Sequence, residues 1–428
     1  MISLLDKTKI SSYNFIFPFT IILYGGAATQ FARSLGNLSS IGNTIALLLL
    51  FIFFYKNKIK INNTFLFYIS GFTLYAILTF IQNNRISLMW LTQIYIFMTI
   101  AYSICYVLKS KFFVVYETIL YKLCCLSLII WGLYLLFPTP ILELGKLIQF
   151  DKTFTDESES CNIIFYNFLF GRENDFEIIT RNCGFAWEPG AFSSYIIFAI
   201  FCNILRTDFK IKDNKPLLIF FTSLITTQST TGFGILVIIL LFFIFYKKKF
   251  GYLTILLPLI LVIINLPFVT DKLLEEYNNI QNVNINLFDS TSHHSLGRMY
   301  SLVLDYEEFL RHPLLGLGGY EDGRWLYQQG YTISTISGIG TLLYKYGIIN
   351  TILFIVVLLQ TCKLITKQFN RKTGYLLFPI LIGIMISYEI WLQPIIICFW
   401  MYSIFTKENK QNNEIKLRSS NSYKRMLS

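Results

Sequence analysis

The sequence predicts an all-α integral membrane protein with about twelve transmembrane helices, and three observations support this class. Of the 428 residues, 54% are hydrophobic and 17% aromatic, and only 14% are charged, with a mean hydropathy of +0.54. Apolar runs close to the thickness of a bilayer recur from one end of the chain to the other. The basic residues gather in alternate connections between these runs, which is the charge bias of cytoplasmic loops. Such a composition does not suit a soluble protein of this length.

Hydropathy predicts the transmembrane spans in order along the chain. They are 14–32, 41–55, 64–82, 88–108, 119–137, 184–205, 216–229, 231–246, 251–267, 336–361, 374–388 and 390–405. The first lacks the short apolar core and cleavage site of a signal peptide, so we expect it to be retained. We therefore expect a single polytopic membrane domain over residues 1–428, with both termini in the cytoplasm. Despite the net charge of +11, residues 406–428 are expected to form a disordered basic tail rather than a nucleic-acid site.

Two long loops carry most of the acidic residues and are expected on the periplasmic side, at 138–183 and 268–335. The second loop contains SLGRMYSLVLDYEEFLRHP, in which apolar residues fall at helical spacing while Asp305, Glu307 and Glu308 take the other face. We expect an amphipathic helix on the outer membrane surface, ended by Pro313. The first loop contains Cys161 and Cys183, which an oxidising compartment would allow to form a disulfide.

Two spans are interrupted by polar residues near their outer ends. In RNCGFAWEPGAFSSYIIFAIF, Arg181 precedes Glu188, a carboxylate expected inside a span. Because an ionisable group within a membrane is costly, it usually marks a site or pathway. Pro189-Gly190 is expected to loosen the helix there; the alternative is an Arg–Glu pair that only seats the helix. TTQSTTGFG, residues 226–234, either lies buried below the membrane surface or forms a simple tight hairpin.

The second loop also offers three arginines, Arg298, Arg311 and Arg324, together with His312 and Glu321. Arginine binds phosphate through its planar fork and keeps its charge, so the arginines indicate an anionic ligand. His312 is a candidate for acid–base chemistry, with helix capping as the alternative. No Cys/His spacing typical of a metal site occurs, so no metal and no cofactor are expected.

The stretches RNCGFAWEPGAFSSY and SLGRMYSLVLDYEEFLRHPLLGLGGY resemble the O-antigen polymerase and O-antigen ligase family of polysaccharide-assembly proteins. The first resembles the family's arginine-to-Glu-Pro entry into a central helix. The second resembles its long outer loop, with a Gly-Arg start and a His-Pro-x-x-Gly-x-Gly end. The resemblance covers residues 181–347, and the twelve-helix layout extends it along the chain.

This resemblance implies a membrane glycosyltransferase of the cell inner membrane that acts on polyprenyl-pyrophosphate-linked oligosaccharides. It implies pyrophosphate binding by Arg181 and Arg298, with Arg311 and Arg324 in reserve. The general base is expected among Glu188, His312 and Glu321. Membrane lipids and a chain-length regulator protein are the implied partners, without nucleic acid.

One departure from the family pattern favours a polymerase over a ligase. Many members carry a His-Asn pair before the helix that follows the long loop, whereas this chain reads YTISTISGIGTLLYKYG there. Two alternatives stay open: a ligase that transfers polymer to a lipid acceptor, and a flippase or other transporter of lipid-linked oligosaccharide. A transporter predicts repeat symmetry and charges spread over many helices, whereas this chain concentrates its charges in two loops.

Overall fold

The computed structural model describes residues 12–24, 39–148, 160–163, 166–169, 181–265, 270, 274, 294–295, 298–329 and 333–406. The helices and short 3-10 turns are, in chain order, α1 (Ser12–Tyr24), α3 (Ser39–Asn57), α4 (Asn63–Asn83), α5 (Leu88–Leu108), α6 (Lys111–Leu136), α7 (Pro138–Ile148), α8 (Pro189–Thr207), α9 (Lys215–Thr226), α10 (Thr230–Lys247), η3 (Phe250–Tyr252), α11 (Leu253–Ile264), α13 (Arg298–Arg311), η5 (Glu321–Gly323), α14 (Trp325–Gln328), α15 (Gly338–Phe369), η6 (Lys372–Leu376), α16 (Leu377–Ser387), α17 (Pro394–Trp400) and α18 (Tyr402–Thr406). Short strands β1 (Ser160–Ile163) and β2 (Tyr166–Leu169) pair antiparallel, and β3 (His294–Ser295) pairs in parallel with β4 (Ile333–Ser334). The described chain is thus predominantly helical, as predicted.

Six of the described helices are long and apolar enough to cross a membrane: α4, α5, α6, α8, α10 and α15. Shorter apolar helices occupy Asn14–Leu23, Leu48–Asn57, Lys215–Thr226 and Lys372–Ser387. The membrane class is supported, while the count of about twelve spans stays a prediction. The expected span 390–405 is divided into two short helices, because α17 ends at Trp400 and α18 begins at Tyr402. Helix α17 begins at Pro394, and proline suits a first helical turn.

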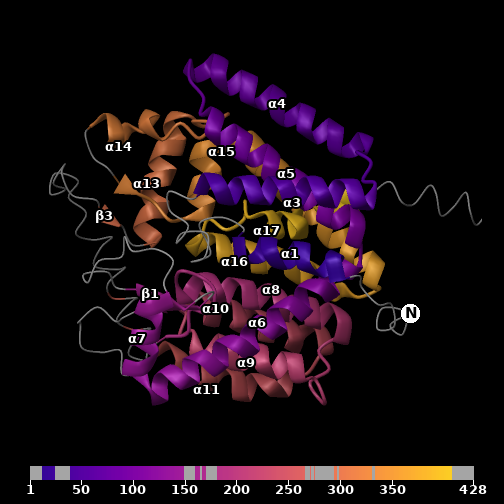
Figure 1. Cartoon of the computed structure of the whole chain (residues 1–428), viewed down its shortest axis with the longest axis vertical. Coiled ribbons are helices and arrows are strands. Elements are labelled where there is room, and N and C mark those ends of the chain that lie inside the picture. The colour runs from indigo at the N-terminus through magenta and orange to yellow at the C-terminus, as the bar shows by residue number, and fades with distance from the viewer. Residues whose placement is uncertain are drawn as a thin grey trace, which may run out of the picture.

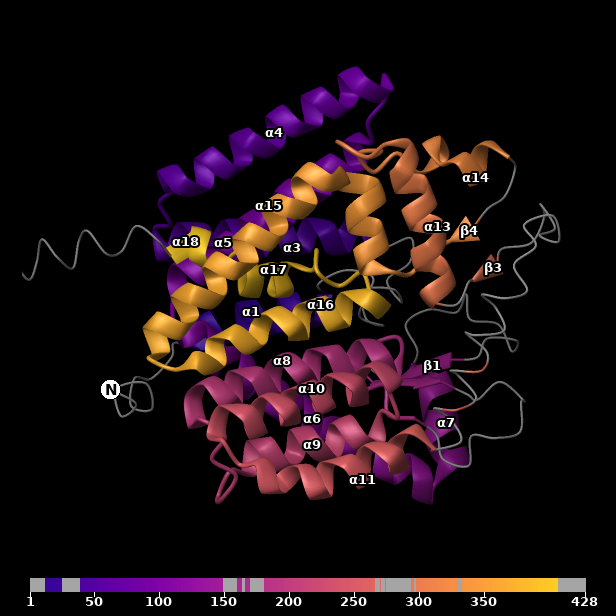
Figure 2. The same ribbon diagram turned by 180° about the vertical axis from the view of Figure 1, so that it is seen from behind.

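Helix α8 is the centre of the helical body. Every residue from Pro189 to Leu205 is buried. Both views place α8 between α16 on one side and α6 and α9 on the other (Figures 1 and 2). Because other elements of the protein cover all of these residues, α8 lies inside the helical body rather than against lipid. Its 19 residues extend about 28 Å, close to the thickness of the hydrocarbon core of a bilayer.

Elements from the two long loops lie at the same end of the helical body. Helix α7 and strand β1 come from the first loop, and helices α13 and α14 from the second. Figure 2 shows these elements at the end opposite α18, and Figure 1 shows them on one side of the helical body. Such an arrangement is compatible with two loops on one side of a membrane; which side that is stays a prediction. Residues 407–428, the expected basic tail, lie outside the described residues.

The expected amphipathic helix is present as α13, but its buried face differs from the prediction. Asp305 and Glu308, expected on the solvent face, are buried with Ser301 and Leu304. An exposed stripe instead contains apolar Met299, Val303, Tyr306 and Leu310. The acidic face packs toward α15 and the 324–325 segment, where Glu308 accepts a hydrogen bond of 2.9 Å from the Trp325 backbone N–H. Partners elsewhere in the chain therefore decided which face of α13 was buried.

Helix α15 is kinked at Gly347, and the glycine-rich turn after α13 fills the kink. Gly347 has a φ of 69°, which suits glycine. The carbonyls of Tyr344 and Lys345 accept hydrogen bonds from the backbone N–H groups of Leu317 and Gly318, each at 2.9 Å. In return, the Ile348 N–H donates to the Pro313 carbonyl at 2.8 Å. The kink leaves backbone carbonyl and N–H groups without partners inside the helix, and the second loop forms hydrogen bonds with them. These hydrogen bonds attach the second loop to α15.

Candidate functional site

Arg181 lies beside the polar turn that joins α9 to α10. Its Nε donates to the Thr227 carbonyl at 3.2 Å, and its Nη2 donates to the Gln228 carbonyl at 3.0 Å. The next residue, Asn182, donates through its backbone and its side chain to Thr226, each at 2.9 Å. Thr227 and Ser229 are buried. The TTQSTTGFG stretch is therefore a turn covered by protein, and Arg181 occupies the carbonyls that end α9.

Glu188 precedes α8 instead of lying inside a membrane helix, which corrects the expected span of 184–205. It is the N-cap residue, with extended backbone angles (φ −146°, ψ 157°), and Pro189 occupies the first turn. Proline is favoured there because the N–H it lacks would have no helical partner. Pro189-Gly190 therefore begins the helix rather than loosening it. The half-buried Glu188 carboxylate lies at the positive end of the α8 dipole, where a negative charge is stabilised.

Arg298 is the first residue of α13, and its side chain contacts residues from two other segments. Its Nη1 donates to the Thr231 hydroxyl at 3.2 Å, and its Nη2 donates to the Tyr388 hydroxyl. The guanidinium carbon lies 4.6 Å from the centroid of the Tyr388 ring, in a cation–π arrangement. Thr231 in turn is hydrogen-bonded to Ser387 at 2.7 Å. The start of α13 is thereby joined to the start of α10 and the end of α16.

Tyr388 brings the two arginines and the glutamate into one environment. It hydrogen-bonds with Glu188, and the charges of Glu188, Arg298 and Arg181 all act on it electrostatically. We call Arg181, Glu188, Thr231, Arg298 and Tyr388 the Arg298 cluster. Segments far apart in the sequence thus bring the Arg298 guanidinium and the Glu188 carboxylate to one buried tyrosine, and the charge of Arg181 acts on the same group. This combination can stabilise an anion and accept a proton.

Arg324 forms a buried ion pair with Asp305. Its Nη2 lies 2.8 Å from the Asp305 Oδ1, and the two side chains are 2% and 0% exposed. Its Nη1 also donates to the Thr335 hydroxyl at 2.9 Å. Burial raises the pKa of the Asp305 carboxyl to about 7, against the opposing effects of the Arg324 charge and the Thr335 hydrogen bond. The described contacts give Arg324 a role in holding the second loop together.

The remaining expected site residues lie away from the start of α13. Because α13 has 14 residues, its far end is about 20 Å from Arg298. There Arg311 is exposed and lies over the Trp325 ring, 4.6 Å from its centroid. His312 follows it, and its carbonyl accepts a hydrogen bond from the Gly316 N–H at 3.0 Å. Glu321 begins η5, and its side chain is outside the described residues.

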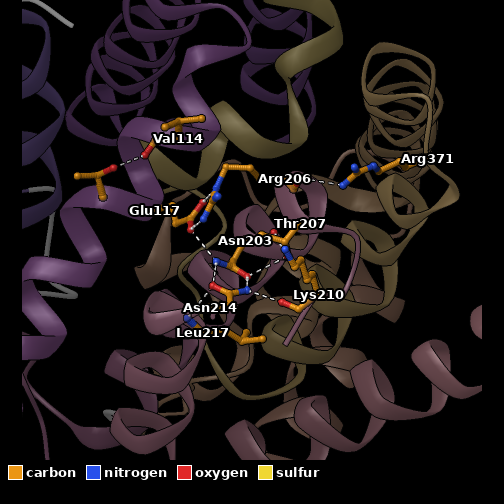
Figure 3. Close-up of polar contacts among 10 residues, drawn as sticks. Val114, Glu117, Asn203, Arg206, Thr207, Lys210, Asn214, Leu217 and Arg371 are labelled. Carbon is orange, nitrogen blue, oxygen red and sulfur yellow. Dashed lines mark hydrogen bonds and ion pairs between the residues drawn. The ribbon is translucent and has the colours of Figure 1, made fainter. Parts of the chain in front are cut away.

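A second polar cluster lies at the other end of α8, around the buried Glu117 (Figure 3). The Glu117 carboxylate accepts hydrogen bonds from Arg206 Nε at 3.0 Å, Arg206 Nη2 at 2.6 Å and Asn203 at 2.7 Å. Asn203 exchanges hydrogen bonds with Asn214, the N-cap of α9, at 2.7 and 3.0 Å. Arg371 donates to two last-turn carbonyls of α8, each at 2.9 Å. These groups bind one another, so we interpret them as a clamp on α6, α8 and α9.

The sequence analysis found three members of the Arg298 cluster and missed two. Thr231 belongs to the TTQSTTGFG stretch, which was noted without a role for any one hydroxyl. Tyr388 stands at the end of an apolar run, and nothing in its neighbourhood distinguishes it from an interfacial tyrosine. The expected disulfide is not tested, because Cys183 is buried whereas the side chain of Cys161, in β1, is outside the described residues.

Comparison with known proteins supplies a family for part of the chain. Residues 216–341 match the family model described as O-Antigen ligase. This range begins in α9 and ends in the first turn of α15, so it contains Thr231 and Arg298 but not Arg181, Glu188 or Tyr388. No curated protein and no solved structure matches the chain. The chain therefore carries an O-antigen ligase family domain at residues 216–341, in agreement with its resemblance to the O-antigen polymerase and ligase family.

Proposed function

We propose that this protein is an O-antigen, or surface-polysaccharide, polymerase of the inner membrane. It joins polyprenyl-pyrophosphate-linked oligosaccharide repeat units at the periplasmic face. The observation that carries the proposal is the Arg298 cluster, in which Arg298 and Glu188 contact one buried tyrosine and the charge of Arg181 acts on it. The family match over residues 216–341 includes Arg298 and supports the same reaction class.

In the proposed reaction, a hydroxyl at the non-reducing end of one repeat unit attacks the sugar carbon bonded to the pyrophosphate of another. The new glycosidic bond forms as the bond from that carbon to the pyrophosphate oxygen breaks. Glu188 takes the hydroxyl proton, and Arg181 and Arg298 stabilise the negative charge on the departing polyprenyl pyrophosphate. The arginines accelerate the step because the leaving group gains negative charge as its bond to the sugar carbon breaks, so their stabilising effect is greatest in the transition state.

Glu188 is preferred as the base because of its place in the cluster. It hydrogen-bonds with the tyrosine that also binds Arg298, whereas His312 lies at the far end of α13. Arg311 and Arg324 are assigned to the fold of the second loop rather than to the pyrophosphate, because each has a partner there. Glu321 stays a weaker candidate for the base. The arrangement that we propose needs no metal or cofactor.

A ligase that transfers polymer to a lipid acceptor is the second candidate, favoured by the description of the matched family model. We prefer the polymerase because YTISTISGIGTLLYKYG, residues 331–347, lacks the histidine that many ligases carry before the corresponding helix. The proposal includes both termini in the cytoplasm, from the positive-inside pattern, and a chain-length regulator as partner.

Deletion of the gene, followed by gel electrophoresis of surface polysaccharide and of lipid-linked intermediates, tests the proposal. A polymerase predicts that long chains disappear while single repeats remain attached to the surface lipid. Loss of all attached repeats, with accumulation of lipid-linked polymer, would instead identify a ligase. Lipid-linked single repeats retained on the cytoplasmic face would identify a transporter. Re-expression of the wild-type protein and of Glu188→Gln completes the test, because only the former should restore long chains.

A further inference from the structure

Tyr388 joins parts of the proposed site that come from distant segments of the chain. It follows α16, while Glu188 precedes α8 and Arg298 begins α13. Tyr388 is buried, and its hydroxyl contacts both of these charged side chains. We infer that Tyr388 is a positioning residue that fixes the base Glu188 relative to the pyrophosphate ligand Arg298. This inference rests on the proposed function and adds to it a residue outside the matched family domain.

The hydroxyl of Tyr388 is chemically suited to this place. A tyrosine hydroxyl has one donor and can also accept. The ionised Glu188 carboxylate can only accept, and the Arg298 guanidinium can only donate. Tyr388 therefore donates to Glu188 while it accepts from Arg298, so one oxygen sets the distance between the two groups. The ring also lies under the Arg298 guanidinium at 4.6 Å and limits its rotation.

Two glycines leave room for Tyr388, one beside its side chain and one beside its backbone. A Cβ on Gly190, in the first turn of α8, would overlap the Tyr388 hydroxyl. A Cβ on Gly338, at the start of α15, would overlap the Tyr388 carbonyl. The Tyr388 N–H donates to the Ile384 carbonyl at 3.0 Å, which ties it to the last turn of α16. Residues of three helices, α8, α15 and α16, thus surround Tyr388. A site on rigid elements keeps its geometry better than one on loops.

Tyr388→Phe tests the inference because it keeps the ring and removes only the hydroxyl. We expect kcat for chain formation by purified protein with lipid-linked repeats to fall about ten- to hundredfold, the usual effect of losing hydrogen bonds to charged groups. The matched control is Tyr402→Phe, which removes another buried hydroxyl, one bonded to Gln368 at 3.0 Å. That variant should keep its kcat, because Tyr402 lies in α18, outside the Arg298 cluster.

A double-mutant cycle separates positioning from a general loss of stability. If Tyr388 acts through Arg298, adding Tyr388→Phe to Arg298→Lys should lower kcat by much less than the product of the two single effects. Multiplicative effects, or a kcat in Tyr388→Phe equal to that of the wild type, would overturn the inference. Failure of the wild-type protein to lengthen lipid-linked repeats would instead count against the proposed function, so the two results are distinguishable.

Discussion

Replacement of Arg298 by lysine should remove most chain formation even though the positive charge is retained. The guanidinium donates through separate nitrogens to Thr231 and Tyr388 and lies 4.6 Å from the Tyr388 ring centroid. A lysine has one compact ammonium on a flexible stem, so it cannot keep both hydrogen bonds, the stacking and a pyrophosphate contact together. Losing one such contact to the leaving group raises the barrier by about 2–4 kcal/mol, which corresponds to roughly a hundredfold or more in rate.

The assay is the length distribution of surface polysaccharide in a strain that expresses each variant, with the level of membrane protein measured in parallel. Arg298→Lys and Arg298→Ala should both lose long chains at a normal protein level. Arg311→Lys is the matched control, because Arg311 is exposed at the other end of the same helix; it should keep long chains. Near wild-type chain length in Arg298→Lys would refute the reasoning and leave Arg181 as the remaining candidate for the pyrophosphate ligand.

Three further predictions concern packing, pH and the clamp. Gly190→Ala should lower chain formation about tenfold or more by overpacking against Tyr388. The control Gly234→Ala should keep chain formation, because its added Cβ meets nothing within 4 Å. Equal activities of the two variants would contradict the close packing of Gly190 against Tyr388. The folded pKa of Asp305, raised to about 7, means that its stabilising contribution is present below about pH 4 and is lost as pH rises through about 7. The melting temperature in detergent should therefore decline across that window more steeply in the wild type than in Asp305→Asn, and parallel curves would exclude this titration. Glu117→Ala should lower the free energy of unfolding by about 3 kcal/mol, because it leaves Arg206 without its carboxylate partner. The melting temperature should fall while the activity per folded molecule is kept. A loss of activity without a loss of stability would contradict the structural role of the Glu117 cluster.

The sequence predicted the candidate site in part because charged groups near membrane segments are few and conspicuous. Arg181, Glu188 and Arg298 were identified from their cost in an apolar setting and from their motifs. Their chemical environment was not predictable in the same way. Glu188 was expected inside a span, yet Pro189 starts α8 and leaves the carboxylate just before it. A window of hydropathy averages over such a boundary, whereas the helix start depends on one residue.

Helix α13 shows the same limit for the assignment of faces. The apolar spacing in residues 299–310 correctly predicted a helix, because local periodicity is enough for that. It wrongly placed Asp305 and Glu308 on the solvent face. Arg324 and the Trp325 backbone N–H, later in the chain, supply the partners that permit these acids to be buried. Periodicity carries no information about partners beyond its own segment.

The sequence by itself determined the membrane class, the positions of the main apolar helices and the loops that carry the charged residues. These properties depend on composition and local pattern, since the cost of placing polar groups in lipid acts on each segment separately. Only the tertiary structure decided that Tyr388 would meet Glu188 and Arg298, and that Gly190 and Gly338 would make room for it. Such contacts join residues that lie between 50 and 200 positions apart in the chain. They arise from the packing of α8, α13, α15 and α16, because close packing satisfies buried polar groups through whichever neighbours the fold supplies.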